Sequence, residues 1–266
     1  MLDLEFSELS DPGRVRTRNE DYLGHVAPGS PSQARSHGWL FALADGVGGQ
    51  RQGEVASRAA VQEVLAGFRR AKDGAPHKDV LTQIVQSANA RVCESEALSG
   101  RSGAGMASTI VAAALRFDRA TVAHVGDSRC YLIRSGDAKP ITRDHTVVAD
   151  QSRLGLISDQ EAAQSSQRHV LSRSLGMNLF ANVDIDEAQL LPGDVLLLCS
   201  DGLHGAVTAA DMAEVTRRHR DLHAAARELV DRANEQDGDD NVSLQIIRIH
   251  SVERMGMYRG RPYKLR

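Results

Sequence analysis

The stretch Trp39-Leu40-Phe41-Ala42-Leu43-Ala44-Asp45-Gly46-Val47-Gly48-Gly49 joins a continuous apolar run to a carboxylate and a group of glycines. An apolar run of this length predicts a buried strand. We expect the strand to stop at Asp45, because the glycines that follow allow a sharp turn. The stretch therefore places an acidic side chain at the end of a core strand.

Similar acidic positions occur further along the chain. Asp127 follows Gly126 after an apolar strand, Asp201 follows the apolar run at residues 195–199, and Asp240 precedes another at residues 242–249. Each Asp-Gly pair taken alone is also a common turn dipeptide. If the strand ends meet, however, the carboxylates would repel one another and raise their own pKa values. Hard divalent cations would relieve this repulsion, and oxygen ligands favour Mg²⁺ or Mn²⁺ over zinc.

The remaining pattern alternates helices and strands. Helical periodicity covers two stretches after Asp45 and again residues 209–218 and 222–234, while residues 108–115, 121–125 and 130–133 predict strands that form an antiparallel meander. Residues 150–182 are polar and rich in Ser and Gln, so we expect a mobile surface insertion there. Residues 251–266 are basic, and we expect a flexible tail.

Composition sets the class of protein. The chain has 266 residues with 41% hydrophobic and 25% charged side chains, which predicts one globular domain, placed here at residues 1–250. A net charge of -3 gives no bias toward nucleic acid. Three widely spaced cysteines indicate neither a disulfide framework nor a zinc site, and no apolar stretch has the length of a membrane span. We therefore expect a monomeric cytoplasmic protein without a membrane partner.

Five segments in order carry a resemblance to a known family. They are Gly13-Arg14-Val15-Arg16-Thr17-Arg18-Asn19-Glu20-Asp21, Ala44-Asp45-Gly46-Val47-Gly48-Gly49, His124-Val125-Gly126-Asp127-Ser128-Arg129, Cys199-Ser200-Asp201-Gly202-Leu203 and Asp239-Asp240-Asn241-Val242-Ser243. Together they resemble the metal-dependent protein phosphatases of the type-2C class, and most closely its bacterial branch. The resemblance implies an α+β fold, a four-layer α-β-β-α sandwich of two antiparallel sheets flanked by helices, with residues 150–182 as a flap.

The resemblance also implies a set of metal ligands. Two Mg²⁺ or Mn²⁺ ions, with a possible third, would be held by Glu20, Asp45, Gly46, Asp127, Asp201 and Asp240. In this set Asp45 bridges two ions, Glu20 acts through water, and Asp127 joins Asp201 around the weaker third ion. Asp21 would orient waters or Arg16 from behind the ligands, and Asn241 would position its neighbour.

The implied reaction removes phosphate from phosphoserine and phosphothreonine in proteins, and Arg16, Asp45 and Asp201 are the implied catalytic residues. A water held between the ions would attack phosphorus in line, while the planar guanidinium of Arg16 grips two phosphate oxygens. Val47 stands where many eukaryotic relatives carry a histidine, so the general acid is unassigned. The bacterial resemblance implies phosphorylated proteins and a cognate Ser/Thr kinase as partners.

Other interpretations remain open from sequence. The same metal motifs would serve a phosphoesterase acting on small molecules or nucleotides, and a regulatory pseudophosphatase would keep the ligands without turnover. His145 is more typical of a structural histidine than of a catalytic one. Arg173 is the residue of the insertion that we would test first for substrate contact.

Overall fold

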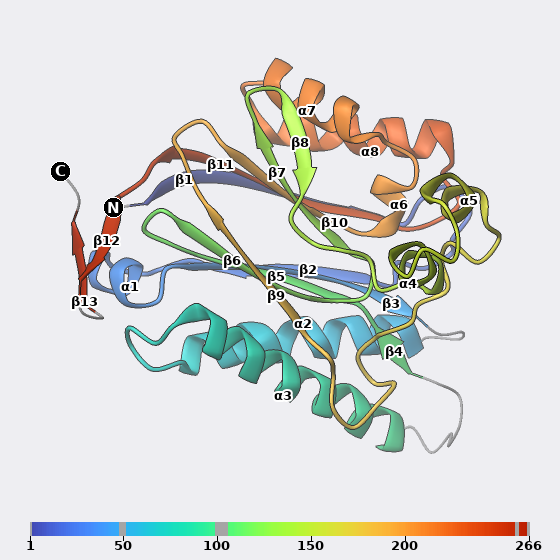
Figure 1. Cartoon of the computed structure of the whole chain (residues 1–266), viewed down its shortest axis with the longest axis horizontal. Coiled ribbons are helices and arrows are strands. Elements are labelled where there is room, and N and C mark those ends of the chain that lie inside the picture. Colours follow the sequence, from blue (N-terminus) through green and yellow to red (C-terminus); the bar gives the residue numbers. More distant parts are fainter. Residues whose placement is uncertain (1, 48–51, 99–105, 259–260, 265–266) are drawn as a thin grey trace.

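Two antiparallel β-sheets lie face to face in the computed structural model, which describes residues 2–47, 52–98, 106–258 and 261–264 (Figure 1). The first sheet has the order β2 (Asp21–Val26), β3 (Trp39–Val47), β5 (Ile110–Arg116), β6 (Arg119–Val125) and β9 (Asp184–Gln189), with β4 (Ala107–Ser108) paired to β3. The second has the order β1 (Asp3–Asp11), β11 (Val242–Ser251), β10 (Val195–Cys199), β7 (Arg129–Arg134) and β8 (Asp137–Pro140).

The apolar run that ends at Asp45 forms β3, in the interior of the first sheet. Its side chains alternate between two cores, since Leu40 and Ala42 pack toward helices while Phe41 and Leu43 pack toward the other sheet. Burial on both faces explains why the sequence shows a continuous apolar run without polar alternation.

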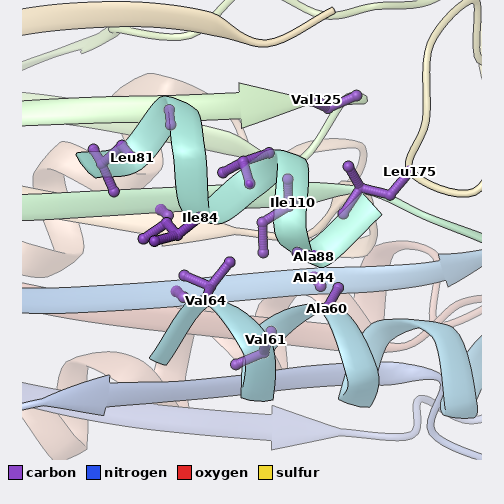
Figure 2. Close-up of a cluster of buried hydrophobic side chains, with 14 of the residues drawn as sticks. Ala44, Ala60, Val61, Val64, Leu81, Ile84, Ala88, Ile110, Val125 and Leu175 are labelled. Atoms are coloured by element: carbon purple, nitrogen blue, oxygen red, sulfur yellow. The ribbon is translucent and has the colours of Figure 1, made fainter. Parts of the chain in front are cut away.

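Helices cover the outer face of each sheet. Helices α2 (Gln52–Arg70) and α3 (His77–Leu98) pack on the first sheet, and α7 (Ala209–Arg218) and α8 (Leu222–Gln236) pack on the second (Figure 1). Figure 2 shows the core under α2 and α3, where Val64, Ile84 and Ile110 meet. The predicted four-layer sandwich is confirmed. Among the described residues, no helix is both long and apolar enough to cross a bilayer.

The predicted meander is wrong at its third strand. Strands β5 and β6 pair as expected, but β7 pairs with β10 and β8 in the opposite sheet. The chain changes sheet at Gly126, whose φ of +105° lies in the left-handed region that glycine tolerates best. Periodicity predicts a strand correctly yet cannot tell which sheet it joins.

The predicted insertion at residues 150–182 is only partly a surface segment. It includes most of α4 (Val147–Arg153) and all of α5 (Asp159–Gln164). Its last part returns to the core, where Leu175 is fully buried and Ala181 is 8% exposed, and Leu175 bridges to Ser108. The expectation that the whole stretch lies outside the core is therefore wrong, because the returning segment packs against α3.

The basic end of the chain has regular structure. Strands β12 (Met255–Tyr258) and β13 (Arg261–Lys264) pair as an antiparallel hairpin where the sequence predicts a flexible tail. The short α1 (Pro31–Ser36) and α6 (Asp201–His204) complete the described elements. Of these, α6 matters for function, because it begins at one of the predicted ligands.

Candidate functional site

The ends of strands from both sheets bring acidic residues to one edge of the sandwich. Asp21 and Asp45 are directly paired across β2 and β3. Burial raises the pKa of Asp45 well above its ordinary value, and nearby carboxylates raise it further. In order of effect these are Asp21, Asp201, Asp127 and Asp240. The structure therefore brings the predicted aspartates into one electrostatic neighbourhood.

Uncompensated oxygens mark this site as a place for cations. Asp21 and Asp201 each keep one buried carboxylate oxygen, Oδ1, without a hydrogen-bond partner. The pKa of Asp21 rises to about 7 because of its burial and the nearby aspartates, and that of Asp127 rises to about 7 chiefly through burial. Buried like charges with free lone pairs fit a hard divalent ion, which would neutralise them and use those oxygens.

A different group in the described part of the chain has the spacing of a metal site. The ligand atoms of His124, His145 and Asp184 all lie within 4.8 Å of one another. Asp45, Asp201 and Asp240 do not form so compact a group, so their assignment rests on their mutual electrostatics and unpaired oxygens. The two sites differ in donor type, because the aspartate site offers oxygen alone.

Hydroxyl groups on the neighbouring strands hold the backbone of Asp45. Its N–H donates to Thr109 Oγ1 at 2.8 Å, and its carbonyl accepts from Ser108 Oγ at 2.9 Å. Since Thr109 Oγ1 accepts there, its proton is free to donate to Ser128 Oγ at 2.7 Å. The Ser108-Thr109 pair therefore positions the residue predicted to bridge two ions.

Gly46 lies where only a glycine fits. A Cβ built on Gly46 would lie 2.1 Å from the carbonyl oxygen of Gly53 in α2, and one built on Gly53 would lie 2.9 Å from Glu20 Oε2. This contact packs the start of α2 against the end of β3 and brings the Glu20 carboxylate beside them. Burial raises the pKa of Glu20, and Arg16 opposes that shift.

Arg16 joins the cluster from the loop between β1 and β2. Its Nη2 donates to Asp240 Oδ2 at 3.0 Å and its Nε donates to the Asp239 carbonyl at 3.2 Å. Asp240 raises the pKa of the Arg16 guanidinium most, followed among its charged neighbours by Glu20 and Asp45. The side chain stays 52% exposed, so its cationic end is accessible from solvent beside the carboxylates.

Asn241 and Asp21 support the site differently from one another. The Asn241 side chain donates to the carbonyls of Pro12 and Arg18 and accepts from the N–H of Glu20, so it holds the loop that carries Arg16. Asp21 accepts from Ser200 Oγ at 2.8 Å. The predicted action of Asp21 on Arg16 has no contact to support it, because the hydrogen bonds of Arg16 go to residues 239 and 240.

Two histidines near the cluster were missed by sequence reasoning. His169, from the insertion, places Nδ1 3.4 Å from Asp201 Oδ2, and His204 Nε2 lies 2.9 Å from the Asp127 carbonyl. Both line a pocket of about 820 Å³ that also reaches Arg173. His204 follows Asp201 by three residues on one helical turn, a spacing that would have identified it. Nothing in the sequence near His169 indicates its spatial partner.

Comparison with known proteins agrees with this architecture. The profile of the family described as "Protein phosphatase 2C" matches residues 14–243. The serine/threonine phosphatase stp of Listeria innocua is 33% identical over 95% of this chain and 96% of its own length.

Solved structures agree as well. The S. agalactiae serine/threonine phosphatase superposes with a TM-score of 0.84 and 28% identity, covering 93% of this chain and all of its own. The catalytic domain of the serine/threonine phosphatase PstP, solved with two manganese ions, gives a TM-score of 0.79 at 28% identity, covering 94% of this chain and all of its own. The chain therefore belongs to the protein phosphatase 2C family and is a metal-dependent serine/threonine phosphatase.

Proposed function

We propose that this phosphatase hydrolyses phosphoserine and phosphothreonine in proteins at the edge of the sandwich where Asp45, Asp201 and Asp240 face Arg16. The observation that carries the proposal is a group of neighbouring carboxylates, which together raise the pKa of Asp45, beside an accessible arginine. Two divalent cations held there, Mg²⁺ or Mn²⁺, would lower the pKa of a coordinated water and neutralise the phosphoryl oxygens. The two manganese ions of the PstP structure support this ion class and number.

Each acidic residue then has a defined task. Asp45 would bind both ions. The Gly46 carbonyl would be a ligand of one ion, and Asp201 and Asp240 would be ligands of the other. Glu20 would contact the ion at Gly46 through a bound water. The hydroxyls of Ser108 and Thr109 keep the Asp45 backbone in place, which keeps its carboxylate aimed into the site.

Asp127 would hold a third, weaker ion together with Asp201. Asp127 lines the same pocket as His169, the neighbour of Asp201, which supports this assignment. Burial and the neighbouring carboxylates favour the protonated form of Asp127, so ion binding there must displace a proton.

Arg16 would bind the phosphate of the substrate. Its guanidinium has five N–H donors, of which two are engaged with residues 239 and 240. The remaining donors can meet phosphate oxygens as a planar fork, which a lysine could not do. The contact with Asp240 fixes the guanidinium beside an ion ligand, so bound phosphate would lie between the arginine and the ions.

We further propose that the protein acts in the cytoplasm as a monomer and reverses the marks of a bacterial Ser/Thr kinase. The serine/threonine phosphatases of Listeria innocua and S. agalactiae that resemble this chain support a bacterial setting. A phosphoesterase acting on nucleotides is the competing hypothesis that the same metal ligands would serve.

Hydrolysis of a phosphothreonine peptide, with Mn²⁺ and after chelation, tests the proposal. We expect turnover with Mn²⁺, none in EDTA, recovery when Mn²⁺ is returned, and no turnover by Asp45→Asn. Asp231→Asn, which changes an exposed carboxylate on α8, is the matched control and should behave as wild type. A clear preference for nucleotides over the peptide, or full activity after chelation, would contradict the proposal.

A further inference from the structure

A hydrogen-bonded chain connects the insertion to the turn that carries Asp127. Arg173 Nη1 donates to Asp184 Oδ1 at 3.0 Å, and Asp184 Oδ2 lies 3.2 Å from Nε2 of His145. The other ring nitrogen of His145, Nδ1, accepts from the backbone N–H of Gly126 at 3.2 Å. Gly126 is the residue directly before Asp127, so side chains alone link Arg173 to this turn.

The tautomer of His145 follows from its partners. A backbone N–H can only donate, so Nδ1 must carry a lone pair and Nε2 must carry the proton. The proton on Nε2 then points to Asp184, which accepts it. Burial lowers the pKa of His145, which keeps the ring neutral and in this one tautomer. Asp184 therefore selects the ring orientation that lets His145 receive the Gly126 N–H.

The same tautomer argues against a metal ion at His124, His145 and Asp184, despite their close spacing. An ion at His145 Nε2 would have to replace the proton that Asp184 accepts, while Nδ1 is already engaged by Gly126. His124 stacks on His145 with ring centroids 4.6 Å apart, and its Nε2 lies 2.7 Å from the carbonyl of Arg143. These contacts therefore fix the position of the His145 ring.

The turn at Gly126 is held on both sides by histidines. The backbone N–H of His145 donates to the Gly126 carbonyl at 3.0 Å and its ring Nδ1 accepts from the Gly126 N–H, while His204 Nε2–H donates to the Asp127 carbonyl at 2.9 Å. Gly126 has a φ of +105°, and a Cβ there would lie 2.6 Å from Thr109 Cγ2. The turn therefore has little freedom, and the direction of the Asp127 carboxylate depends on the two imidazole rings.

The insertion shares this network through its returning segment. The N–H of Ser172 donates to the carbonyl of His145 at 2.8 Å, and Arg173 follows directly. Arg173 Nη1 also lies 3.3 Å from His145 Nε2. Movement of residues 172–173 would therefore move His145 and the turn together.

We propose that Asp184 and His145 are positioning residues that aim the Asp127 carboxylate for ion binding, and that Arg173 connects this alignment to the insertion. The inference rests on the proposed ion site at Asp127. Removal of a residue that orients a metal ligand by hydrogen bonds typically lowers metal affinity by about 10–100-fold. The effect should be confined to the weakest ion, because Asp45 and Asp240 are held by other contacts.

Calorimetric titration of the chelator-stripped full chain with MnCl₂ tests the proposal. Asp184→Ala should weaken the weakest Mn²⁺ event about 10–100-fold, leave the tighter events unchanged, and reproduce the isotherm of Asp127→Asn. Asp184→Asn keeps an oxygen that can accept from His145 Nε2–H, so it should restore most of the lost affinity. Glu187→Gln, an exposed change on the same strand, is the control that should match wild type.

The outcomes separate this proposal from the assigned activity. A wild-type isotherm for Asp184→Ala, or loss of all Mn²⁺ binding by a variant with a native circular dichroism spectrum, overturns the positioning role. If Asp184→Ala does not fold, His145→Phe answers the same question, because it keeps the ring stack on His124 and removes both ring hydrogen bonds. Failure of the phosphatase proposal would appear elsewhere, as a wild-type protein that binds Mn²⁺ without hydrolysing phosphothreonine peptide.

Discussion

Replacing Asp127 by asparagine should stabilise the ion-free protein while weakening its ion binding. Asp127 is 6% exposed, and burial followed by the carboxylates of Asp201 and Asp144 raises its pKa from 3.8 to about 7. The folded protein therefore holds a proton there that the unfolded chain releases near pH 4. Asparagine has a similar shape and no charge, so it removes this penalty.

The sign and size of the effect follow from proton linkage. Below about pH 4 both states are protonated and the substitution should change little. Between about pH 4 and 7 the folded wild type binds more protons, so its free energy of unfolding falls by about 1.4 kcal/mol per pH unit. Above about pH 7 the loss is complete, at most about 4 kcal/mol, and the advantage of Asp127→Asn should stay constant.

Thermal unfolding in EDTA from pH 4.5 to 8 measures this difference. We expect the melting temperature of Asp127→Asn to exceed that of wild type by a margin that grows up to about pH 7. Saturating Mn²⁺ should reverse the order, since wild type gains stability from ion binding that the variant has lost. A variant that is less stable at pH 8 in EDTA, or a difference that does not change with pH, would refute the reasoning.

Three further changes test other parts of the account. Arg16→Ala should raise KM for a phosphothreonine peptide and lower kcat/KM by about 10–100-fold, because it removes charge-assisted hydrogen bonds worth about 1.5–3 kcal/mol; an unchanged KM in steady-state kinetics would argue against phosphate binding there. Gly46→Ala should lower the melting temperature and abolish Mn²⁺-dependent turnover, because its Cβ would lie 2.1 Å from the Gly53 carbonyl oxygen; normal turnover would show that the contact is not needed. Leu175→Ala should lower the free energy of unfolding by about 2–5 kcal/mol in denaturant titrations, as truncations in other cores do. Leu179 is 78% exposed, so Leu179→Ala should lower it by less than about 0.5 kcal/mol. Equal effects would place the returning segment outside the core.

Sequence periodicity predicted the elements that are buried on one or both faces. The buried strand that carries Asp45 and the helix α7 at residues 209–218 agree with the structure because apolar spacing reports burial directly. The predicted end of the strand at Asp45 is two residues short, because Gly46 and Val47 pair with β4. The pairing of β7 with the second sheet was not predictable in this way, since an apolar strand looks the same in either sheet.

The same distinction applies to the candidate site. Acidic residues at strand ends could be read from the chain because a carboxylate after an apolar run is locally conspicuous, as at Asp45 and Asp201. The residues that position these carboxylates could not be predicted, because Thr109 and His145 act through contacts with residues distant in sequence. Asn241 illustrates the difference, since its backbone N–H donates to Asp240 Oδ1 at 2.9 Å, in keeping with the expectation that it positions its neighbour. Its side chain also holds the loop around Arg18 and Glu20, which nothing in the sequence indicates.

The returning part of the insertion was misjudged for a related reason. Polar composition is typical of a surface segment, but the two buried apolar side chains of the stretch, Leu175 and Ala181, pack into the core. Asn89 and Gln86 of α3 complete the attachment by hydrogen bonds to the backbone at residues 176–181. Composition averaged over thirty residues hides such isolated contacts.

The most direct test of the account is a crystal structure of the chain grown with Mn²⁺, with the ions located by their anomalous scattering. We predict strong peaks in contact with the carboxylates of Asp45, Asp201 and Asp240, on the side that faces Arg16. Peaks confined to other parts of the molecule, or those three side chains without manganese between them, would contradict the account.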